Sequence, residues 1–163
     1  MPTLSVLMPL FFRENPDFLN VSLASLAAQT RPADEIVLAQ EGTLTDAHRA
    51  VLRRWEATLG PRLKLVDIGD RRGLPACLNV GLAHCTGDYV ARFDTDDQCL
   101  PDRFERQLAY LDAHPDVVLL GGHMAEFDPT LQHLIAYKRV PLTDAAIRCF
   151  AKWRNPFNHP TVV

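Results

Sequence analysis

Short apolar runs alternate with amphipathic stretches along most of this chain, and that alternation limits what it can fold into. Residues 3–10 read TLSVLMPL, which is too short for a helix and apolar enough for a strand buried on both faces. Similar runs occupy residues 35–40, 63–68 and 89–93, and the stretches between them carry apolar residues at helical spacing. We therefore expect an α/β fold with a mostly parallel central sheet and helices on both faces.

Capping residues and helix breakers set the limits of the expected helices. Asn15-Pro16 and Thr45-Asp46 are typical helix starts, and Gly60-Pro61 and His114-Pro115 are typical stops. The helices are expected over about 16–29, 46–59, 74–85 and 101–113. After Gly122 the pattern weakens. A short fifth strand is expected at 117–120, before this point. Beyond it we expect a strand at 134–140, a short helix at 143–152, and a strand that begins at 161–163.

Composition restricts the class of protein. The 163 residues are 47% hydrophobic and 23% charged and show no repeat or linker, so one domain spanning 1–163 is expected. The net charge of −3 gives no overall positive field, which argues against a nucleic-acid partner. The N-terminus lacks a signal-peptide pattern, and the four cysteines form no C-x-x-C pair. A cytoplasmic location with reduced cysteines is expected.

An acidic cluster follows the strand expected at 89–93. Asp94, Asp96 and Asp97 place three carboxylates within four residues. Two such charges about 4 Å apart repel by about 4 kcal/mol at an effective dielectric constant of 20, so a cation or a shared proton must offset them. Carboxylates are hard ligands that suit Mg²⁺ or Mn²⁺. The alternative is an acidic turn that supplies negative charge to the N-terminus of the helix opened by Pro101.

Other polar and aromatic residues follow the neighbouring strands. Phe11 and Phe12 come after the first strand, Glu41 after the second, and residues 70–73 after the third. The carboxyl ends of parallel strands meet at one edge of a sheet, so these residues are expected beside the acidic cluster. An aromatic ring can stack on a base, a carboxylate can accept from a ribose, and an arginine can pair with a phosphate. A nucleotide site is therefore expected at this edge.

A series of motifs, taken in order, resembles family 2 glycosyltransferases of the GT-A fold, and in particular the branch that builds bacterial exopolysaccharide and capsule. The resemblance covers essentially the whole chain. Its matching segments are Ser5–Pro9, Ser25–Thr30, Glu41-Gly42, Gly73-Leu74, Leu78–Leu82, Gly87–Tyr89, Ala91–Asp97 and Leu100–Gln107. It implies inverting transfer from a nucleotide-diphosphate sugar, without a covalent intermediate, and a divalent metal, Mn²⁺ or Mg²⁺, that stabilises the departing diphosphate.

The resemblance also assigns roles to residues. Asp96 would hold the metal, Asp94 would lie near the ribose and metal, and Asp97 would support either. The donor is expected to be a UDP-sugar and the acceptor a saccharide or a lipid-linked saccharide, which would bring the full-length protein to the inner face of the plasma membrane as a peripheral protein. The residues expected to bind the nucleotide sugar are Pro9, Leu10, Phe11, Glu14, Glu41, Asp70, Arg71, Gly73, Asn79, Arg92, Asp94 and Thr95.

In this family the general base lies downstream of a segment that resembles residues 155–162. We therefore expect the acceptor-binding part and its base to lie beyond Val163. A second hypothesis is a non-catalytic module that binds a nucleotide or a partner protein. A phosphoryl-accepting receiver domain fits poorly, because its acidic residues would follow the first and third strands, whereas the cluster here follows the fourth.

Overall fold

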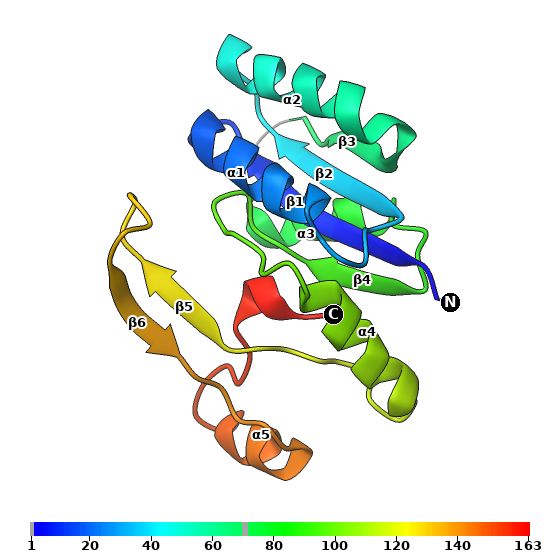
Figure 1. The fold of residues 1–163 in the computed structure, drawn as a ribbon, viewed down its shortest axis with the longest axis vertical. Helices are drawn as coiled ribbons and strands as arrows, with labels where there is room; N and C mark the ends of the chain where they lie inside the picture. The colour runs from blue at the N-terminus through cyan, green and yellow to red at the C-terminus, as the bar shows by residue number, and fades with distance from the viewer. Residues whose placement is uncertain (1, 70–71) are drawn as a thin grey trace.

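Four parallel strands form the central sheet of the computed structural model, which describes residues 2–69 and 72–163 (Figure 1). The spatial order is β3-β2-β1-β4. In register, β1 pairs with β2 from Ser5 opposite Glu35 to Phe11 opposite Glu41, and β4 pairs on the other side of β1. The strands are β1 (Leu4–Phe11), β2 (Glu35–Glu41), β3 (Leu63–Asp67) and β4 (Tyr89–Arg92).

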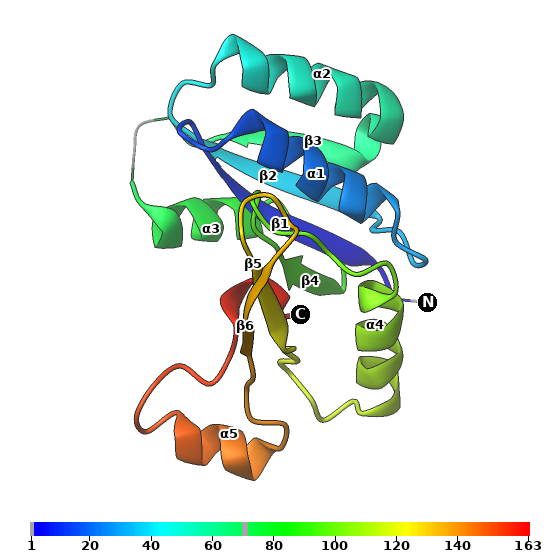
Figure 2. The same cartoon turned by 60° about the vertical axis from the view of Figure 1, so that its left-hand side comes forward.

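Helices cover both faces of this sheet, as the sequence predicts (Figures 1 and 2). The helices α1 (Pro16–Ala27), α2 (Asp46–Leu59) and α4 (Arg103–Ala113) share one core with the even-numbered residues of β1. On the other face, α3 (Leu74–Leu82) packs through Cys77 against Ala39 of β2. The predicted caps are present: Asn15 Oδ1 accepts from Asp17 N at 2.9 Å, and Thr45 Oγ1 accepts from His48 N at 3.3 Å.

One buried carboxylate ties the amino ends of the strands together. Glu35 opens β2 and accepts hydrogen bonds from the hydroxyl of Ser5, the backbone N–H of Thr86 and the ammonium of Lys64. Burial alone would raise the pKa of Glu35, but these donors outweigh it and lower the pKa to about 2. The ionised carboxylate therefore joins β1, β2, β3 and the connection into β4.

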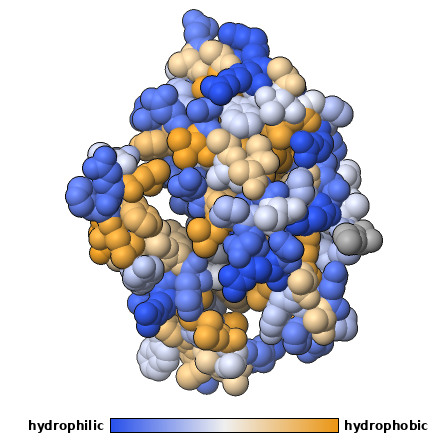
Figure 3. Space-filling view, in the orientation of Figure 1, coloured by the Kyte–Doolittle hydropathy of each residue, from blue (hydrophilic) through white to orange (hydrophobic). Residues whose placement is uncertain are grey.

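Most of the chain after α4 stands away from the sheet, and its last residues return to β4 (Figures 1 and 2). It contains β5 (Met124–Phe127), which pairs in antiparallel fashion with β6 (Leu134–Lys138), followed by α5 (Asp144–Phe150) and a 3₁₀ turn, η2 (His159–Thr161). The space-filling view shows apolar side chains gathered over the β5–β6 hairpin and again at α5 (Figure 3). No helix in the described ranges is both long and apolar enough to cross a bilayer.

Several sequence predictions fail in this C-terminal part. The strand expected at 117–120 is wrong, because its only ladder-like contact is a single pair in which Leu120 and Val163 exchange two hydrogen bonds of 2.9 Å. The strand expected at 161–163 is also wrong, because the 3₁₀ turn η2 occupies its first residue. The strand β5 was not predicted. Its four residues alternate between half-buried and exposed, and the pairing with β6 defines it as a strand.

The third predicted helix was too long. It ends at Leu82 rather than Cys85, because the N–H groups of His84 and Cys85 turn back to carbonyls three residues earlier, at 3.0 and 3.1 Å.

Candidate active site

The topological switch point of the sheet lies between the carboxyl ends of β1 and β4, where successive strands change the side of β1 on which they are added. The chain moves outward from β1 to β3 and then returns to place β4 on the other side of β1. Ligands of open α/β sheets bind in the crevice outside such a switch point. The hydroxyl of Thr95, just after β4, donates to the carbonyl of Pro9 in β1 at 3.3 Å and ties the two strand ends together.

The acidic cluster lies at this switch point. One carboxylate oxygen from each of Asp94, Asp96 and Asp97 can be chosen so that all three lie within 4.8 Å of one another. Asp94 and Asp97 are half-buried and Asp96 is exposed. The hydroxyl of Ser22 in α1 donates to the carbonyl of Asp97, so the turn is anchored to the helix that follows β1. This donor set of three hard oxygens fits a divalent cation such as Mn²⁺ or Mg²⁺.

The alternative reading of the cluster as charge for a helix N-terminus does not match the structure. α4 begins at Arg103, six residues after Asp97, and its N-cap is Asp102, which makes no side-chain capping bond. The acidic residue in the first turn of α4 is Glu105. None of the cluster carboxylates therefore caps this helix.

Electrostatics set the cluster apart from ordinary surface carboxylates. Burial raises the pKa of Asp97 to about 6, with further contributions from the negative charges of Asp94 and Asp96. Burial also raises the pKa of Asp94, although Arg92 forms an ion pair with its Oδ2. In the β1–α1 connection, the pKa of Glu14 is raised by burial and then by Asp96. Four carboxyl groups thus share a region in which the positive charges of Arg92 and Arg103 only partly offset the causes that raise the pKa values.

Arg92 contacts Asp94 through its guanidinium and Arg103 through its carbonyl. It is buried, and its Nε is a buried polar atom without a hydrogen-bond partner. Its carbonyl accepts from Nη2 of Arg103 at 3.2 Å, and the guanidinium of Arg103 lies over the rings of Phe93 and Phe104. Burial lowers the pKa of Arg103. The sequence analysis did not single out Arg103, although it belongs to the matching Leu100–Gln107 segment.

His159 also reaches this region from the far end of the chain. Burial lowers its pKa, and the next causes are the positive charge of Arg92 and the opposing effect of Asp94, so the imidazole lies beside that ion pair. The 3₁₀ turn η2, which His159 opens, is held against the sheet by a hydrogen bond of 2.9 Å from the N–H of Arg92 to the carbonyl of Val162. No local pattern around residue 159 points to this position.

A small pocket of about 210 Å³ lies beside the cluster, at the ends of β1 and β2 and the start of α3. It gathers five of the residues expected to bind the nucleotide sugar, and two that were not expected, Leu74 and Cys77. Its lining is Pro9, Leu10, Phe11, Glu41, Gly73, Leu74 and Cys77. The apolar stripe of the third predicted helix contains both added residues, but a stripe by itself indicates a core face rather than a pocket wall.

The structure gives Glu41 a partner that the sequence did not predict. Its Oε1 accepts from the backbone N–H groups of Arg72 and Gly73, the latter at 2.6 Å. The carboxylate therefore holds the loop that leads into α3. Asn79 is exposed on α3 and does not line the pocket. Asp70 and Arg71 lie outside the described residues.

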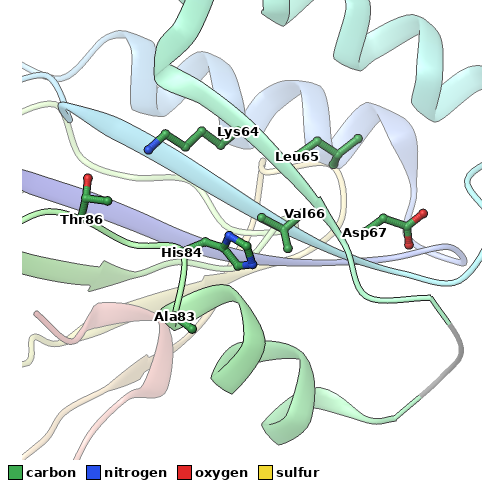
Figure 4. A pocket seen from close by; sticks show the side chains of 7 residues that line it. All are labelled: Lys64, Leu65, Val66, Asp67, Ala83, His84 and Thr86. Atoms are coloured by element: carbon green, nitrogen blue, oxygen red, sulfur yellow. The ribbon is translucent and has the colours of Figure 1, made fainter.

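A larger cavity of about 680 Å³ opens at the sheet edge between β3 and the end of α3 (Figure 4). Its lining shares no residue with the acidic cluster or the small pocket. It is formed by Lys64, Leu65, Val66, Asp67, Ala83, His84 and Thr86. The larger cavity is thus separate from the candidate active site.

Comparison with known proteins decides the family. The profile described as "Glycosyl transferase family 2" matches residues 5–162. The chain belongs to glycosyltransferase family 2. The sheet order and helix placement agree with the GT-A fold of solved members. One of them is the mannosyltransferase PcManGT from Pyrobaculum calidifontis in complex with GDP-Man and Mn²⁺, with a TM-score of 0.61 and 28% identity over 74% of this chain and 35% of that one.

Curated relatives carry the names of bacterial glycosyltransferases. The amylovoran biosynthesis glycosyltransferase AmsE from Erwinia amylovora is 46% identical over 98% of this chain and 58% of its own length. The UDP-Gal:alpha-D-GlcNAc-diphosphoundecaprenol beta-1,3-galactosyltransferase from Escherichia coli is 33% identical over 99% of this chain and 58% of its own. The chain therefore spans somewhat more than half the length of these relatives.

Proposed function

We propose that this family 2 chain is the donor-binding core of a metal-dependent, inverting glycosyltransferase that uses a nucleotide-diphosphate sugar. The observation that carries the proposal is the cluster of Asp94, Asp96 and Asp97, with oxygens within 4.8 Å, at the switch point beside a pocket of nucleotide-base size. Carboxylates with raised pKa values in a crevice are typical of functional sites.

Each part of the site would hold a different part of the donor. The three cluster carboxylates would hold Mn²⁺ or Mg²⁺, which when bound stabilises the negative charge that develops on the departing diphosphate. Phe11 offers an aromatic face for the base, and Glu41 keeps the loop into α3 in place at the pocket wall. Arg92 orients Asp94 through their ion pair.

The names of the relatives support a choice of donor and acceptor. We infer a UDP-sugar as donor, because the Escherichia coli relative is named for UDP-Gal, and a saccharide or lipid-linked saccharide as acceptor in surface polysaccharide synthesis. The general base and the acceptor-binding segment would then lie beyond Val163, in the part of the relatives that this chain does not span. The complete protein would work in the cytoplasm, at the inner face of the plasma membrane.

Calorimetric titration tests the donor site directly. UDP, GDP and dTDP are titrated into the chain with and without Mn²⁺. We expect UDP to bind only with the metal. Asp96→Asn should weaken that binding at least tenfold, because it removes the most accessible carboxylate of the cluster.

The matched control is Asp112→Asn, an exposed carboxylate on α4 that lies outside the cluster. This variant should bind UDP as the parent chain does. If a folded chain binds none of the three nucleotides, the donor-site proposal fails, and a module that binds a partner protein becomes the better description.

A further inference from the structure

The segment between α4 and the last residue has no interior of its own. No residue from 112 to 162 is buried, although the segment contains many large apolar side chains. In the β5–β6 hairpin, Ala125 lies opposite Tyr137 and Phe127 lies opposite Leu134, on either side of a register shift. Tyr137 is 66% exposed and Phe127 45%. The hairpin therefore presents apolar side chains that nothing in the described residues covers.

Two aromatic–basic triplets flank α5. Tyr137-Lys138-Arg139 ends β6, and Lys152-Trp153-Arg154 follows the helix. Trp153 is 85% exposed. The chain then returns to the end of β6, where Nδ2 of Asn158 donates to the carbonyl of Lys138 at 3.0 Å. We call the two triplets, together with the exposed apolar side chains of the hairpin, the aromatic–basic surface.

This surface carries a charge opposite to that of the whole chain. The stretch 124–154, which holds the hairpin, α5 and both triplets, contains five basic and three acidic residues, whereas the chain as a whole has a net charge of −3. Lys138 pairs with Glu126 at 3.1 Å, and Arg148 pairs with Asp144 at 2.7 Å. Within residues 2–69 and 72–163, the three remaining Lys and Arg side chains of this stretch, Arg139, Lys152 and Arg154, form no ion pair.

We propose that the aromatic–basic surface docks onto the surface of an anionic lipid bilayer. Trp and Tyr favour the headgroup region because one end of each side chain is apolar and the other is polar. Basic residues near an anionic leaflet strengthen binding through electrostatic attraction. The exposed apolar side chains therefore suit the acyl boundary of the bilayer, and the neighbouring basic side chains that form no ion pair suit its headgroups.

The surface lies next to the candidate active site. Asn158 holds the end of β6, and the next residue, His159, lies beside Arg92 and Asp94. Docking would thus bring the donor site to the bilayer, where a lipid-linked acceptor is found. That consequence rests on the proposed function, whereas docking itself does not.

Vesicle sedimentation of the 163-residue chain tests the proposal. We expect binding to vesicles of phosphatidylcholine with phosphatidylglycerol, weak binding to phosphatidylcholine alone, and loss of binding in high salt. The double variant Lys152→Gln/Arg154→Gln should lower the partition coefficient at least tenfold. Arg53→Gln/Arg54→Gln removes the same charge from exposed positions on α2, across the molecule, and should bind as the parent chain does (Figure 1).

Tryptophan emission gives an independent readout. Trp55 is buried and Trp153 is exposed, so anionic vesicles should shift the emission of the chain to shorter wavelength, and Trp153→Phe should abolish that shift. Equal binding to neutral and anionic vesicles would mean that exposed apolar side chains alone cause the binding, as they would if other residues normally covered them in a longer protein. Equal binding to neutral vesicles, no binding to any vesicle, and equally tight binding to RNA would each overturn the proposal. UDP titration of the same variants separates these results from a failure of the donor site.

Discussion

The ionised side chain of Asp97 lowers the stability of the folded chain at a position that belongs to the candidate metal site. Its pKa rises from 3.8 to about 6 on folding, because burial and the charges of Asp94 and Asp96 disfavour the ionised form. The folded chain therefore binds more protons than the unfolded chain between these two values, and stability falls as the pH rises through that window. At neutral pH the full cost is present, and a cation in the cluster would offset it.

Replacing Asp97 should change stability and metal binding in opposite directions. Asp97→Asn should stabilise the chain by about 1–2 kcal/mol at pH 7.5, which is a few degrees in Tm for a chain of this size, and should give no gain near pH 4. The same change should weaken Mn²⁺ binding. Thermal melts at both pH values and a Mn²⁺ titration measure the two effects. With Asp112→Asn as control, an unchanged Tm for Asp97→Asn at pH 7.5 would refute this account.

At the scale of elements, α3 connects the sheet to the pocket. Its glycine, Gly81, lies so close to the sheet that an added Cβ would come within 2.6 Å of Leu7 Cδ1 and 2.9 Å of Ala39 Cβ. One turn earlier in the helix, the thiol of Cys77 donates to the carbonyl of Ala39 at 3.3 Å. The start of α3 supplies Leu74 and Cys77 to the pocket. The seating of the helix therefore fixes one pocket wall.

Gly81→Ala should disturb that seating. Alanine favours a helix over glycine by about 1 kcal/mol, but overpacking costs about 1–3 kcal/mol, and here one of the opposing atoms is the Cβ of Ala39, which cannot rotate away. We expect a net loss of stability in urea unfolding and weaker UDP binding.

The control for that experiment is Gly122→Ala, where the nearest atom would be Thr161 Cβ at 3.8 Å. It should change the unfolding free energy by less than about 0.5 kcal/mol. Equal effects of the two substitutions would contradict the proposed seating of α3.

At the scale of the whole molecule, burial divides the chain into two parts. The buried hydrophobic residues lie between Leu4 and Leu111, with Val163 as the exception. The β5–β6 hairpin and α5 keep their shape through hydrogen bonds and partly buried contacts alone. An isolated two-stranded hairpin is only marginally stable in water.

Hydrogen exchange should reveal this division. Amides of β1 and β2 should exchange slowest, at rates set by global unfolding, and those of β5 and β6 should exchange orders of magnitude faster through local opening. Mass spectrometry of peptic fragments measures both sets in one experiment. Equal protection of the hairpin and the central sheet would show that the segment shares the main core after all.

The positions of the strands, helices and acidic cluster were largely predictable from local pattern. Apolar runs of strand length, caps such as Asn15 and breakers such as Gly60-Pro61 act over a few residues, and the structure confirms the elements they predict. The position of the cluster after β4 followed from the same reasoning. The least accurate predictions fall after α4, where the elements are short and exposed and local pattern carries little information.

The sequence by itself thus determined an α/β sheet with an acidic cluster at the carboxyl end of a strand. Only the tertiary structure decided the partners: Glu41 with the amides before α3, Glu35 with Lys64 and Thr86, and Leu120 with Val163. These partners are 29 to 51 residues apart along the chain. Periodicity reports the environment of a residue within its own element, whereas the choice among distant partners depends on how the sheet and helices pack.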